Sequence, residues 1–275
     1  MKPGDCALVA ELCAARAGLI VDPEKTYLLE SRLAPVARRE GFGSIVDLVE
    51  SLRARREERL VWAVVEAMAA GETSFFRDRL AFKQFSDEVL PVMARRREGR
   101  PIRIWSAGCG SGQEVYSLAI NVAEKRGALS GAKVELFASD ISERALEKAQ
   151  SGLYTQFEVQ RGLPIRQLVD HFEKVDEMWA ISPNIRQMVR WRRVNLVADF
   201  SATGQFDVIF CRHVLSALVE PMRVKVLENL AGALAPDGFL FLSEGEIPDN
   251  GAKPLYAVAG RAGLYVRNPA ARAAA

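Results

Sequence analysis

The fold is decided by the stretch IRIWSAGCGSGQEVYSLAI, which occupies residues 102–120. It begins with a short β-rich run, passes through a glycine-rich segment at 107–112, and leads into a helix that we expect from about Glu114 to Arg126. A second β-rich run, Val134–Ala138, follows that helix. Strand, glycine turn, helix and strand in this order predict an open, mostly parallel sheet that binds its ligand at the carboxyl ends of the strands.

The alternation of strands and helices continues toward the carboxyl terminus. We expect a strand at Phe206–Phe210, a helix at Glu220–Ala235 and, after a Pro-Asp-Gly turn, a strand at Phe239–Leu242. The short runs Leu255–Val258 and Gly263–Val266 are joined by a turn and predict antiparallel edge strands. Parallel strands connected by helices require helices on both faces of the sheet.

The segment 174–193 does not follow this alternation and predicts a small β-subdomain. Within it, Met178–Ile181 and Met188–Trp191 are short β-rich runs that we expect to form a hairpin outside the main sheet. The last residues, 269–275, are mostly alanine, and a disordered tail is expected there.

The first 65 residues have a helical period instead. Apolar side chains recur at i, i+4 and i+7 from Leu8 onward, and glycines separate the helices. We expect one helix to run from Asp47 to Val65, with the charged stretch 53–59 as its solvated middle. The expected parts of the chain are a helical N-terminal domain at 1–68, a linker and connecting helix at 69–100, the sheet domain with its β-subdomain at 101–268, and the tail at 269–275.

Composition and charge exclude several classes of protein. The 275 residues are 49% hydrophobic and 26% charged, which is typical of a globular protein. The 37 Lys and Arg residues face 35 Asp and Glu residues, so we expect neither a nucleic acid nor a membrane surface as the main partner. Four cysteines without a C-x-x-C pair predict neither a metal site nor a disulfide framework. Because no signal peptide or membrane-length apolar run is found, the protein is predicted to be cytoplasmic.

The glycine loop favours an adenosine-type ligand without phosphates. Gln113 stands where a dinucleotide fingerprint has its third glycine, and no Gly-Lys-Ser/Thr of a phosphate loop follows. Asp140 ends the next predicted strand, where its carboxylate can accept both hydroxyl protons of a ribose. The alternative is that Asp140 caps the helix that begins near Ser142. Loop and carboxylate together are consistent with S-adenosylmethionine.

Several separated blocks resemble the chemotaxis receptor methyltransferases, the CheR-type family of S-adenosylmethionine-dependent protein-glutamate O-methyltransferases. The block ETSFFRD at 72–78, followed by the glycine loop, is much more specific than the loop alone. The other blocks are ASDI at 138–141, GLY at 152–154, VNL at 194–196 and FDVIFCR at 206–212. The resemblance covers roughly residues 5–267 and implies a class I methyltransferase fold, Rossmann-like and mostly parallel, preceded by a small all-α domain.

The resemblance also implies roles for individual side chains. Arg77 and Arg212 would be the catalytic residues, with Arg77 close to the transferring methyl group and Arg212 beside the sulfonium. Glu114 would accept from the cofactor's amino group, and Asp140 would hold the ribose. The complete cofactor-binding set would be Thr73, Arg77, Gly108, Gly110, Glu114, Asp140, Asn195, Leu196, Arg212 and His213, with Asn195 and Leu196 framing the adenine.

The implied reaction is methyl transfer from S-adenosylmethionine to glutamate side chains of a chemoreceptor, with S-adenosylhomocysteine as the product. A glutamate carboxylate is already ionised at neutral pH, so its attack on the methyl group needs no general base. Arg77 is the residue that we expect to hold this carboxylate bidentately. The alternative is an ordinary surface arginine that begins a helix over 77–98, capped by Asp78.

The resemblance further implies a partner, because the family's N-terminal helices dock on the helical bundle of chemoreceptors. The arginines between Arg32 and Arg59 are therefore candidates for contacting an acidic receptor face. Some members bind the receptor's C-terminal tether through a glycine-rich loop in the β-subdomain, whereas residues 174–193 contain no glycine. We expect a tether-independent monomer that binds no metal.

Three positions depart from the family pattern. The family has Asn where Gly71 and His213 stand, and Tyr where Ala217 stands. Because the family Tyr lies near the methyl group, Ala217 could lower the rate, change the acceptor or abolish turnover. The second hypothesis is therefore a degenerate module that binds S-adenosylmethionine or S-adenosylhomocysteine and regulates a chemosensory pathway. A third, a nucleic-acid or small-molecule methyltransferase, lacks the expected Asx-Pro-Pro-aromatic segment after the strand at 206–210.

Overall fold

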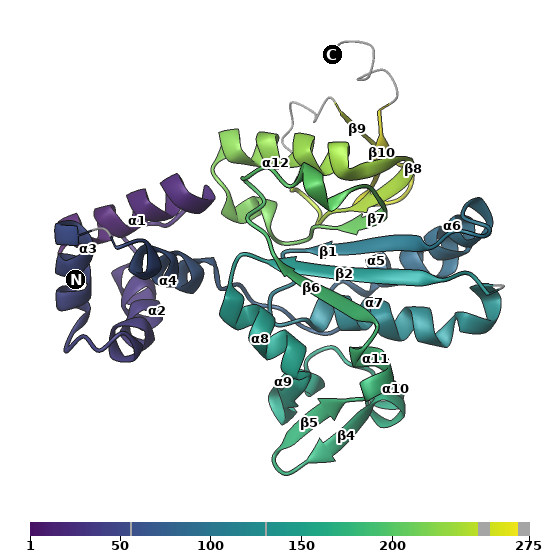
Figure 1. Cartoon of the computed structure of the whole chain (residues 1–275), viewed down its shortest axis with the longest axis horizontal. Helices are drawn as coiled ribbons and strands as arrows, with labels where there is room; N and C mark the ends of the chain where they lie inside the picture. Colours follow the sequence, from purple (N-terminus) through teal and green to yellow (C-terminus); the bar gives the residue numbers. More distant parts are fainter. Residues whose placement is uncertain (56, 130, 247–253, 269–275) are drawn as a thin grey trace. The chain divides into compact units, whose positions relative to one another are not determined.

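The computed structural model describes residues 1–55, 57–129, 131–246 and 254–268 of the chain (Figure 1). The chain divides into two compact units, one formed by residues 1–70 with 216–225 and the other by residues 71–215 with 226–275. The segment 216–225 thus groups with the N-terminal helices, which the sequence pattern does not indicate. The tail predicted at 269–275 lies outside the described residues.

The first unit is built from helices. They are α1 (Pro3–Ala17), α2 (Thr26–Arg39), α3 (Ile45–Arg55) and α4 (Glu58–Ala69). The single helix predicted from Asp47 to Val65 is wrong, because Glu57 has the non-helical dihedrals φ −58° and ψ 120° and precedes a new helix. A β-bridge between Leu19 and Leu218 joins the segment 216–225 to this unit.

A seven-stranded sheet with the order β6-β2-β1-β7-β8-β10-β9 organises the second unit. Its strands are β1 (Ile102–Ala107), β2 (Val134–Asp140), β6 (Val189–Arg193), β7 (Phe206–Phe210), β8 (Leu234–Phe241), β9 (Leu255–Ala257) and β10 (Leu264–Arg267). The first five strands of this order pair in parallel, whereas β10 is antiparallel to both β8 and β9. The predicted parallel sheet with antiparallel edge strands is confirmed. The predicted Pro-Asp-Gly turn lies inside β8, where the register shifts against β7.

Helices cover both faces of this sheet. α7 (Gln113–Glu124) connects β1 to β2, whereas α12 (Glu220–Ala233) connects β7 to β8 in the opposite direction across the sheet. Because such crossovers are right-handed, the two helices lie on opposite faces, as Figure 1 shows. The core beside β7 is aromatic: Phe210 stacks on Phe241 at 4.2 Å between ring centroids, and Phe85 meets Phe210 edge-on.

A second sheet contains three antiparallel strands in the order β3-β5-β4. They are β3 (Leu153–Thr155), β4 (Phe172–Val175) and β5 (Met178–Ile181), accompanied by α8 (Glu143–Ser151), α9 (Gln156–Gln160), α10 (Ile165–His171) and α11 (Pro183–Arg186). The hairpin predicted between Met178–Ile181 and Met188–Trp191 is wrong. β5 pairs with β4 across a two-residue turn, whereas β6 joins the main sheet, because Val189 is buried and Trp191 packs against Tyr116.

The connecting helix predicted at 77–98 is divided. α5 (Arg79–Gln84) passes through the π-helical turn η1 (Phe85–Val89) into α6 (Leu90–Arg96). Pro91 lacks the N–H that an uninterrupted α-helix would use there, which accounts for the local change. No described helix is long and apolar enough to cross a membrane.

Candidate functional site

The glycine loop joins β1 to α7 at the carboxyl edge of the sheet. Gly108, Gly110 and Gly112 have positive φ values of 79°, 54° and 93°, a conformation that other residues rarely adopt. A Cβ on Gly108 would lie 2.4 Å from Cγ2 of Val214, and one on Gly112 would lie 2.9 Å from Cβ of Ala149. Backbone conformation and close packing therefore both require glycine at these two positions.

Asp140, at the end of β2, is tied to this loop. Its Oδ2 accepts from the N–H of Gly110 at 2.8 Å, and its Oδ1 accepts from the N–H of Ser142 at 2.9 Å. The alternative that Asp140 caps α8 is wrong, because Ser142 is the N-cap and its hydroxyl accepts from the N–H of Ala145. Burial raises the pKa of Asp140, and the backbone N–H groups oppose the rise. A carboxylate has about four acceptor sites, so capacity remains for ligand hydroxyls.

Asn195 and Leu196 follow β6, the strand beside β2. The N–H of Val194 donates to the carbonyl of Asp140 at 3.0 Å, which brings this turn next to Asp140. The Oδ1 of Asn195 accepts from the N–H of Val197 at 3.2 Å, and Leu196 is buried. The two positions that the resemblance assigns to the adenine therefore follow a residue that is hydrogen-bonded to the backbone of Asp140, the residue that it assigns to the ribose.

Glu114 and Arg212 form the buried charged centre of the site. Oε1 of Glu114 accepts from the hydroxyl of Ser106 at 2.8 Å, and its Oε2 lies 3.5 Å from Nη1 of Arg212. The Arg212 side chain is 2% exposed and donates from Nη2 to Asp78 at 2.5 Å, whereas its Nε finds no hydrogen-bond partner among the described residues. Burial raises the pKa of Glu114, and the charge of Arg212 opposes the rise.

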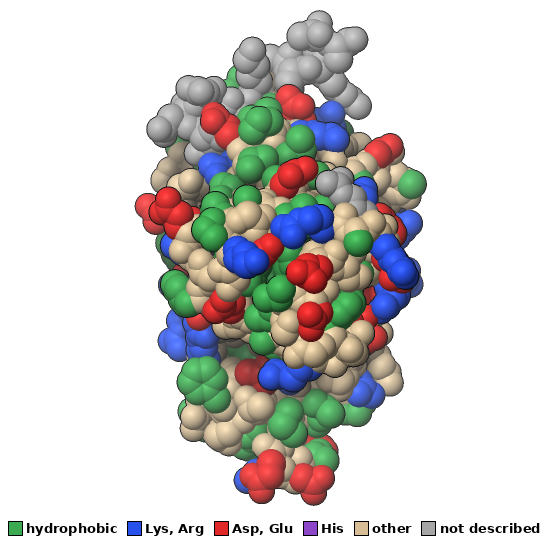
Figure 2. Space-filling model, turned by 90° about the vertical axis from the view of Figure 1, so that its left-hand side faces the viewer, with side chains coloured by type: hydrophobic (Ala, Val, Ile, Leu, Met, Phe, Trp, Pro, Cys, Tyr) green, Lys and Arg blue, Asp and Glu red, His purple; other side chains and the backbone are tan. Residues whose placement is uncertain are grey.

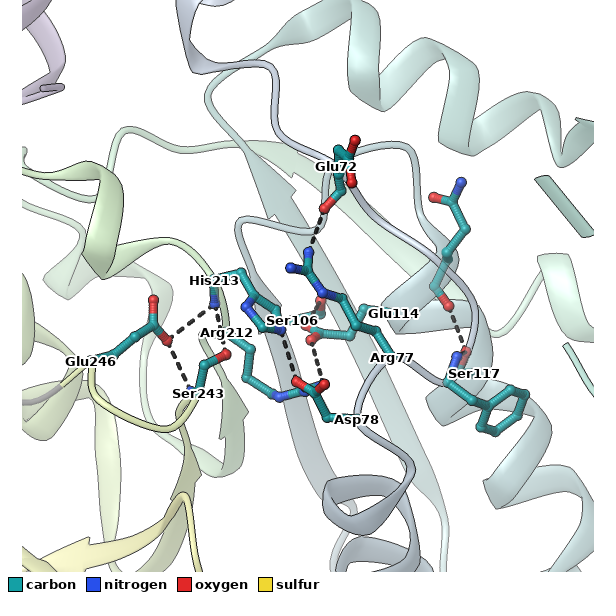
Figure 3. Close-up of polar contacts among 12 residues, drawn as sticks. Glu72, Arg77, Asp78, Ser106, Glu114, Ser117, Arg212, His213, Ser243 and Glu246 are labelled. Carbon is teal, nitrogen blue, oxygen red and sulfur yellow. Dashed lines mark hydrogen bonds and ion pairs between the residues drawn. The ribbon is translucent and has the colours of Figure 1, made fainter. Parts of the chain in front are cut away.

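His213 follows Arg212 in a left-handed conformation, with φ 59°. Its backbone N–H donates to Oγ of Ser243 and to Oε2 of Glu246, and its Nε2 lies 2.9 Å from Oδ2 of Asp78 (Figure 3). Burial lowers the pKa of His213, and the neighbouring guanidinium groups act in the same direction. Asp78 opposes this lowering, and because a carboxylate oxygen can only accept, Nε2 is the nitrogen that donates to Asp78.

The linker contacts both the glycine loop and α7. The N–H of Phe76 donates to the hydroxyl of Ser117, on α7, at 3.0 Å. Phe75 is fully buried, and Thr73 lies beside the loop, since a Cβ on Gly110 would be 3.5 Å from its Cγ2. The ETSFFRD block is thus held against the site by its aromatic residues and one backbone hydrogen bond.

Arg77 projects from this linker, and its Nη1 donates to the carbonyl of Glu72 at 2.6 Å (Figure 3). Its charge lowers the pKa of both Glu114 and His213. The predicted alternative, a surface arginine before an Asp78-capped helix, is wrong about the cap. Asp78 occupies the N-cap position of α5, but its φ is 55° and its side chain makes no capping hydrogen bond.

The structure brings the predicted site residues together along one edge of the sheet. Sequence reasoning misses Asp78, Ser106 and Glu246, all of which contact predicted residues. Ser106 is a polar residue near the end of the predicted strand that begins at Ile102, which is a sequence signal that could have identified it. Glu246 lies five positions after the end of β8, and its burial becomes visible only in the fold. Within the described residues, no group of three or more His, Cys, Asp and Glu side chains is arranged to hold a metal ion.

The departures at Gly71 and Ala217 lie outside this contact network. Gly71 has open space where a Cβ would be added. Ala217 belongs to the segment that groups with the N-terminal helices, where its carbonyl accepts from the N–H of Ile20 at 2.8 Å.

Comparison with known proteins identifies related sequences. The family model described as "CheR methyltransferase, SAM binding domain" matches residues 71–259. Chemotaxis protein methyltransferase 1 of Vibrio cholerae serotype O1 is 36% identical over 235 residues, which are 84% of this chain and 85% of that protein. Chemotaxis protein methyltransferase 1 of Pseudomonas aeruginosa is 35% identical over 237 residues, 85% of this chain and 86% of that protein.

Proposed function

We propose, because this chain belongs to the CheR methyltransferase family, that it transfers the methyl group of S-adenosylmethionine to glutamate side chains of a chemoreceptor. The observation that carries the proposal is the division of charge in the site. Glu114 and Asp140 supply carboxylates next to the glycine loop, and Arg77 and Arg212 supply guanidinium groups. Carboxylates suit an ammonium group and ribose hydroxyls, whereas guanidinium groups suit an acceptor carboxylate.

The residues present fit the cofactor chemically. Glu114 is buried with a raised pKa, so an ammonium group beside it would stabilise its charged form. Asp140 keeps acceptor capacity for hydroxyl groups, and Asn195 and Leu196, which we assign to the adenine, follow a residue that is hydrogen-bonded to its backbone. Bound S-adenosylmethionine supplies an electrophilic methyl group on a sulfonium, which a carboxylate oxygen can accept without any proton leaving.

On the acceptor side, the chain has to hold an already ionised glutamate in line and keep water away from it. Arg77 donates to a backbone carbonyl of its own linker through Nη1. A guanidinium carries further N–H groups, which suit a carboxylate bidentately. We assign this role to Arg77. Arg212 is assigned the role of stabilising the negative charge of Glu114 beside it.

The proposed partner is the cytoplasmic helical bundle of a chemoreceptor, met by a monomer through its N-terminal helices. Of the arginines between Arg32 and Arg59, Arg39, Arg53 and Arg59 are held in ion pairs within the unit. Arg38 and Arg55 are exposed and make no ion pair with other described residues. Charges of both signs are interspersed on the face drawn in Figure 2, so this face carries no single broad basic patch. We therefore propose Arg38 and Arg55 as the residues that contact an acidic face of the receptor.

We also propose that the receptor tether is not required. The turn between β4 and β5 has only two residues, Asp176 and Glu177, and no glycine. A loop of that length offers little backbone to a peptide. Micromolar binding of the isolated tether peptide would contradict this part of the proposal.

The test is incubation of the purified protein with methyl-labelled S-adenosylmethionine and receptor-containing membranes from its own source. Label on a receptor-sized band, released as methanol by mild base, is the expected result because a carboxyl methyl ester is base-labile. Absence of label, on membranes that an active relative does label and from protein that binds S-adenosylhomocysteine, would support the regulatory module instead. Ala217, where the family has Tyr, is the feature that favours that second candidate.

A further inference from the structure

Asp78 directs its side chain to the site rather than to the helix that it precedes. It occupies the N-cap position of α5 but makes no capping hydrogen bond. Its Oδ2 accepts instead from Nη2 of Arg212 at 2.5 Å and from Nε2 of His213 at 2.9 Å (Figure 3). The backbone of Asp78 is left-handed, with a φ of 55°, a conformation that Asp adopts more readily than most residues other than glycine.

Arg212 depends on this carboxylate for its position. The Arg212 side chain is 2% exposed, whereas that of Asp78 is 56% exposed. Among the described residues, Arg212 also forms an ion pair with Glu114, but Oε2 of Glu114 lies 3.5 Å from Nη1, longer than an ordinary charged hydrogen bond. Because Nε has no partner among the described residues, Asp78 provides the one short ionic contact of this buried guanidinium.

Removal of the Asp78 carboxylate would leave Glu114 as the nearest anion for a buried cation. A buried guanidinium that keeps only a long ion pair is costly, so Arg212 would shorten its 3.5 Å contact with Glu114. Oε1 of Glu114 already accepts from the hydroxyl of Ser106, and closure by Arg212 would occupy the other oxygen. The cofactor's amino group would then lose its acceptor.

We propose that Asp78 is a positioning residue that holds Arg212 away from Glu114 and so keeps Glu114 free for the amino group of S-adenosylmethionine. His213 serves as the second anchor of Asp78, since its own backbone N–H is fixed by Ser243 and Glu246. The proposal rests on the role given to Glu114 under the proposed function, but it does not depend on the methyl acceptor.

The test is calorimetric titration of the full chain with two ligands that differ at one end. S-adenosylhomocysteine carries the amino-acid group, whereas 5′-methylthioadenosine lacks it. The variants are Asp78→Asn and Asp78→Gly, because both residues tolerate the left-handed backbone. Asp87→Asn is the matched control, since Asp87 is similarly exposed at 42% and pairs on the surface with Lys125 at 2.9 Å.

Both Asp78 variants should bind S-adenosylhomocysteine about tenfold more weakly or worse, with the affinity for 5′-methylthioadenosine changed less than about twofold. Asp87→Asn should change neither affinity. Unchanged affinity for S-adenosylhomocysteine in both Asp78 variants would overturn the proposal. An equal loss for the two ligands would also overturn it, because that pattern indicates general damage to the site.

Glu114→Gln, measured in the same series, separates this proposal from the site assignment. It should weaken the binding of S-adenosylhomocysteine but not that of 5′-methylthioadenosine. The double variant Asp78→Asn/Glu114→Gln should bind S-adenosylhomocysteine no more weakly than Glu114→Gln alone. Additive losses in the double variant would overturn the coupling between Asp78 and Glu114. If Glu114→Gln leaves both affinities unchanged, the role of Glu114 is wrong, and the proposal for Asp78 is wrong with it. The proposed methyl transfer to a receptor is tested separately by the labelling assay and does not depend on that result.

Discussion

The hydroxyl of Tyr154, on β3 of the small sheet, donates a 2.8 Å hydrogen bond to the backbone carbonyl of Ser111 in the glycine loop. The Tyr154 side chain is fully buried, and a Cβ added to Gly112 would lie 3.1 Å from its hydroxyl. The small sheet therefore fixes the back of the loop that we assign to the cofactor, although it supplies none of the predicted ligands.

Replacement of Tyr154 by Phe should weaken cofactor binding because the Ser111 carbonyl loses its donor. We expect a loss of about 1–2 kcal/mol of stability and a Kd for S-adenosylhomocysteine raised roughly threefold to tenfold. Tyr116→Phe is the matched control, since it removes a buried hydrogen bond of 2.9 Å to Ala149 outside the loop. Calorimetry should show a similar loss of stability in the control with an unchanged Kd, and equal Kd values for all three proteins would refute the link.

Arg77→Ala should lower kcat by about 100-fold or more, because the acceptor carboxylate loses its partner. Arg77 donates to the carbonyl of Glu72, and among the described residues it makes no hydrogen bond with a side chain assigned to the cofactor, so the Kd for S-adenosylhomocysteine should change much less than kcat. Arg77→Lys should recover only part of the rate, since a lysine cannot hold a carboxylate bidentately. Full turnover of Arg77→Ala with unchanged cofactor binding would show that the assignment is wrong.

The affinity for S-adenosylhomocysteine should fall as the pH is lowered, and the fall should begin at a higher pH than an ordinary glutamate would give. Burial raises the pKa of Glu114 above its ordinary value of 4.5, and protonation of this carboxyl removes the charge that attracts the ammonium group. Binding is thus strongest above the raised pKa and is lost as the pH falls through it. The Kd of Glu114→Gln for S-adenosylhomocysteine should depend less on pH than that of the wild type. The same pH dependence in both proteins would contradict the role assigned to Glu114.

Gly108→Ala should destabilise the protein by about 2 kcal/mol or more. The new Cβ would meet Cγ2 of Val214 at 2.4 Å in a backbone with φ 79°. A Cβ added at Gly232, in α12, would have no atom within 4 Å, so Gly232→Ala should stabilise the protein by about 0.5–1 kcal/mol. Thermal melts of the two variants that shift in the same direction would contradict this account of the loop.

The parallel sheet could be predicted from the sequence because its central strands are short, mostly apolar runs rich in β-forming residues. β1 and β7 are almost entirely buried, and glycine turns or helical periods separate them. β6 was harder to place because Val189–Arg193 alternates buried and charged residues like a surface hairpin, whereas its pairing with β2 depends on tertiary contacts such as that of Trp191 with Tyr116. Local patterns do not contain that information.

The site was predictable where a residue follows the end of a strand, as Asp140 does. The sequence predicts a cap at Asp78 because the residue before a helix is ordinarily a cap, and only the fold brings Asp78 to Arg212, which lies 134 positions away. The grouping of residues 216–225 with the N-terminal helices is a similar case, since it depends on the backbone pairing of Leu19 with Leu218.

The most direct measurement is the mass of receptor peptides after the receptor has been incubated with the purified protein and S-adenosylmethionine. The account predicts a mass increase of one methyl group, located by fragmentation on a glutamate side chain and lost after mild base, and it predicts that Arg77→Ala gives much less of it. Unmodified receptor peptides, from protein that binds S-adenosylhomocysteine and with a receptor that an active relative does methylate, would contradict it.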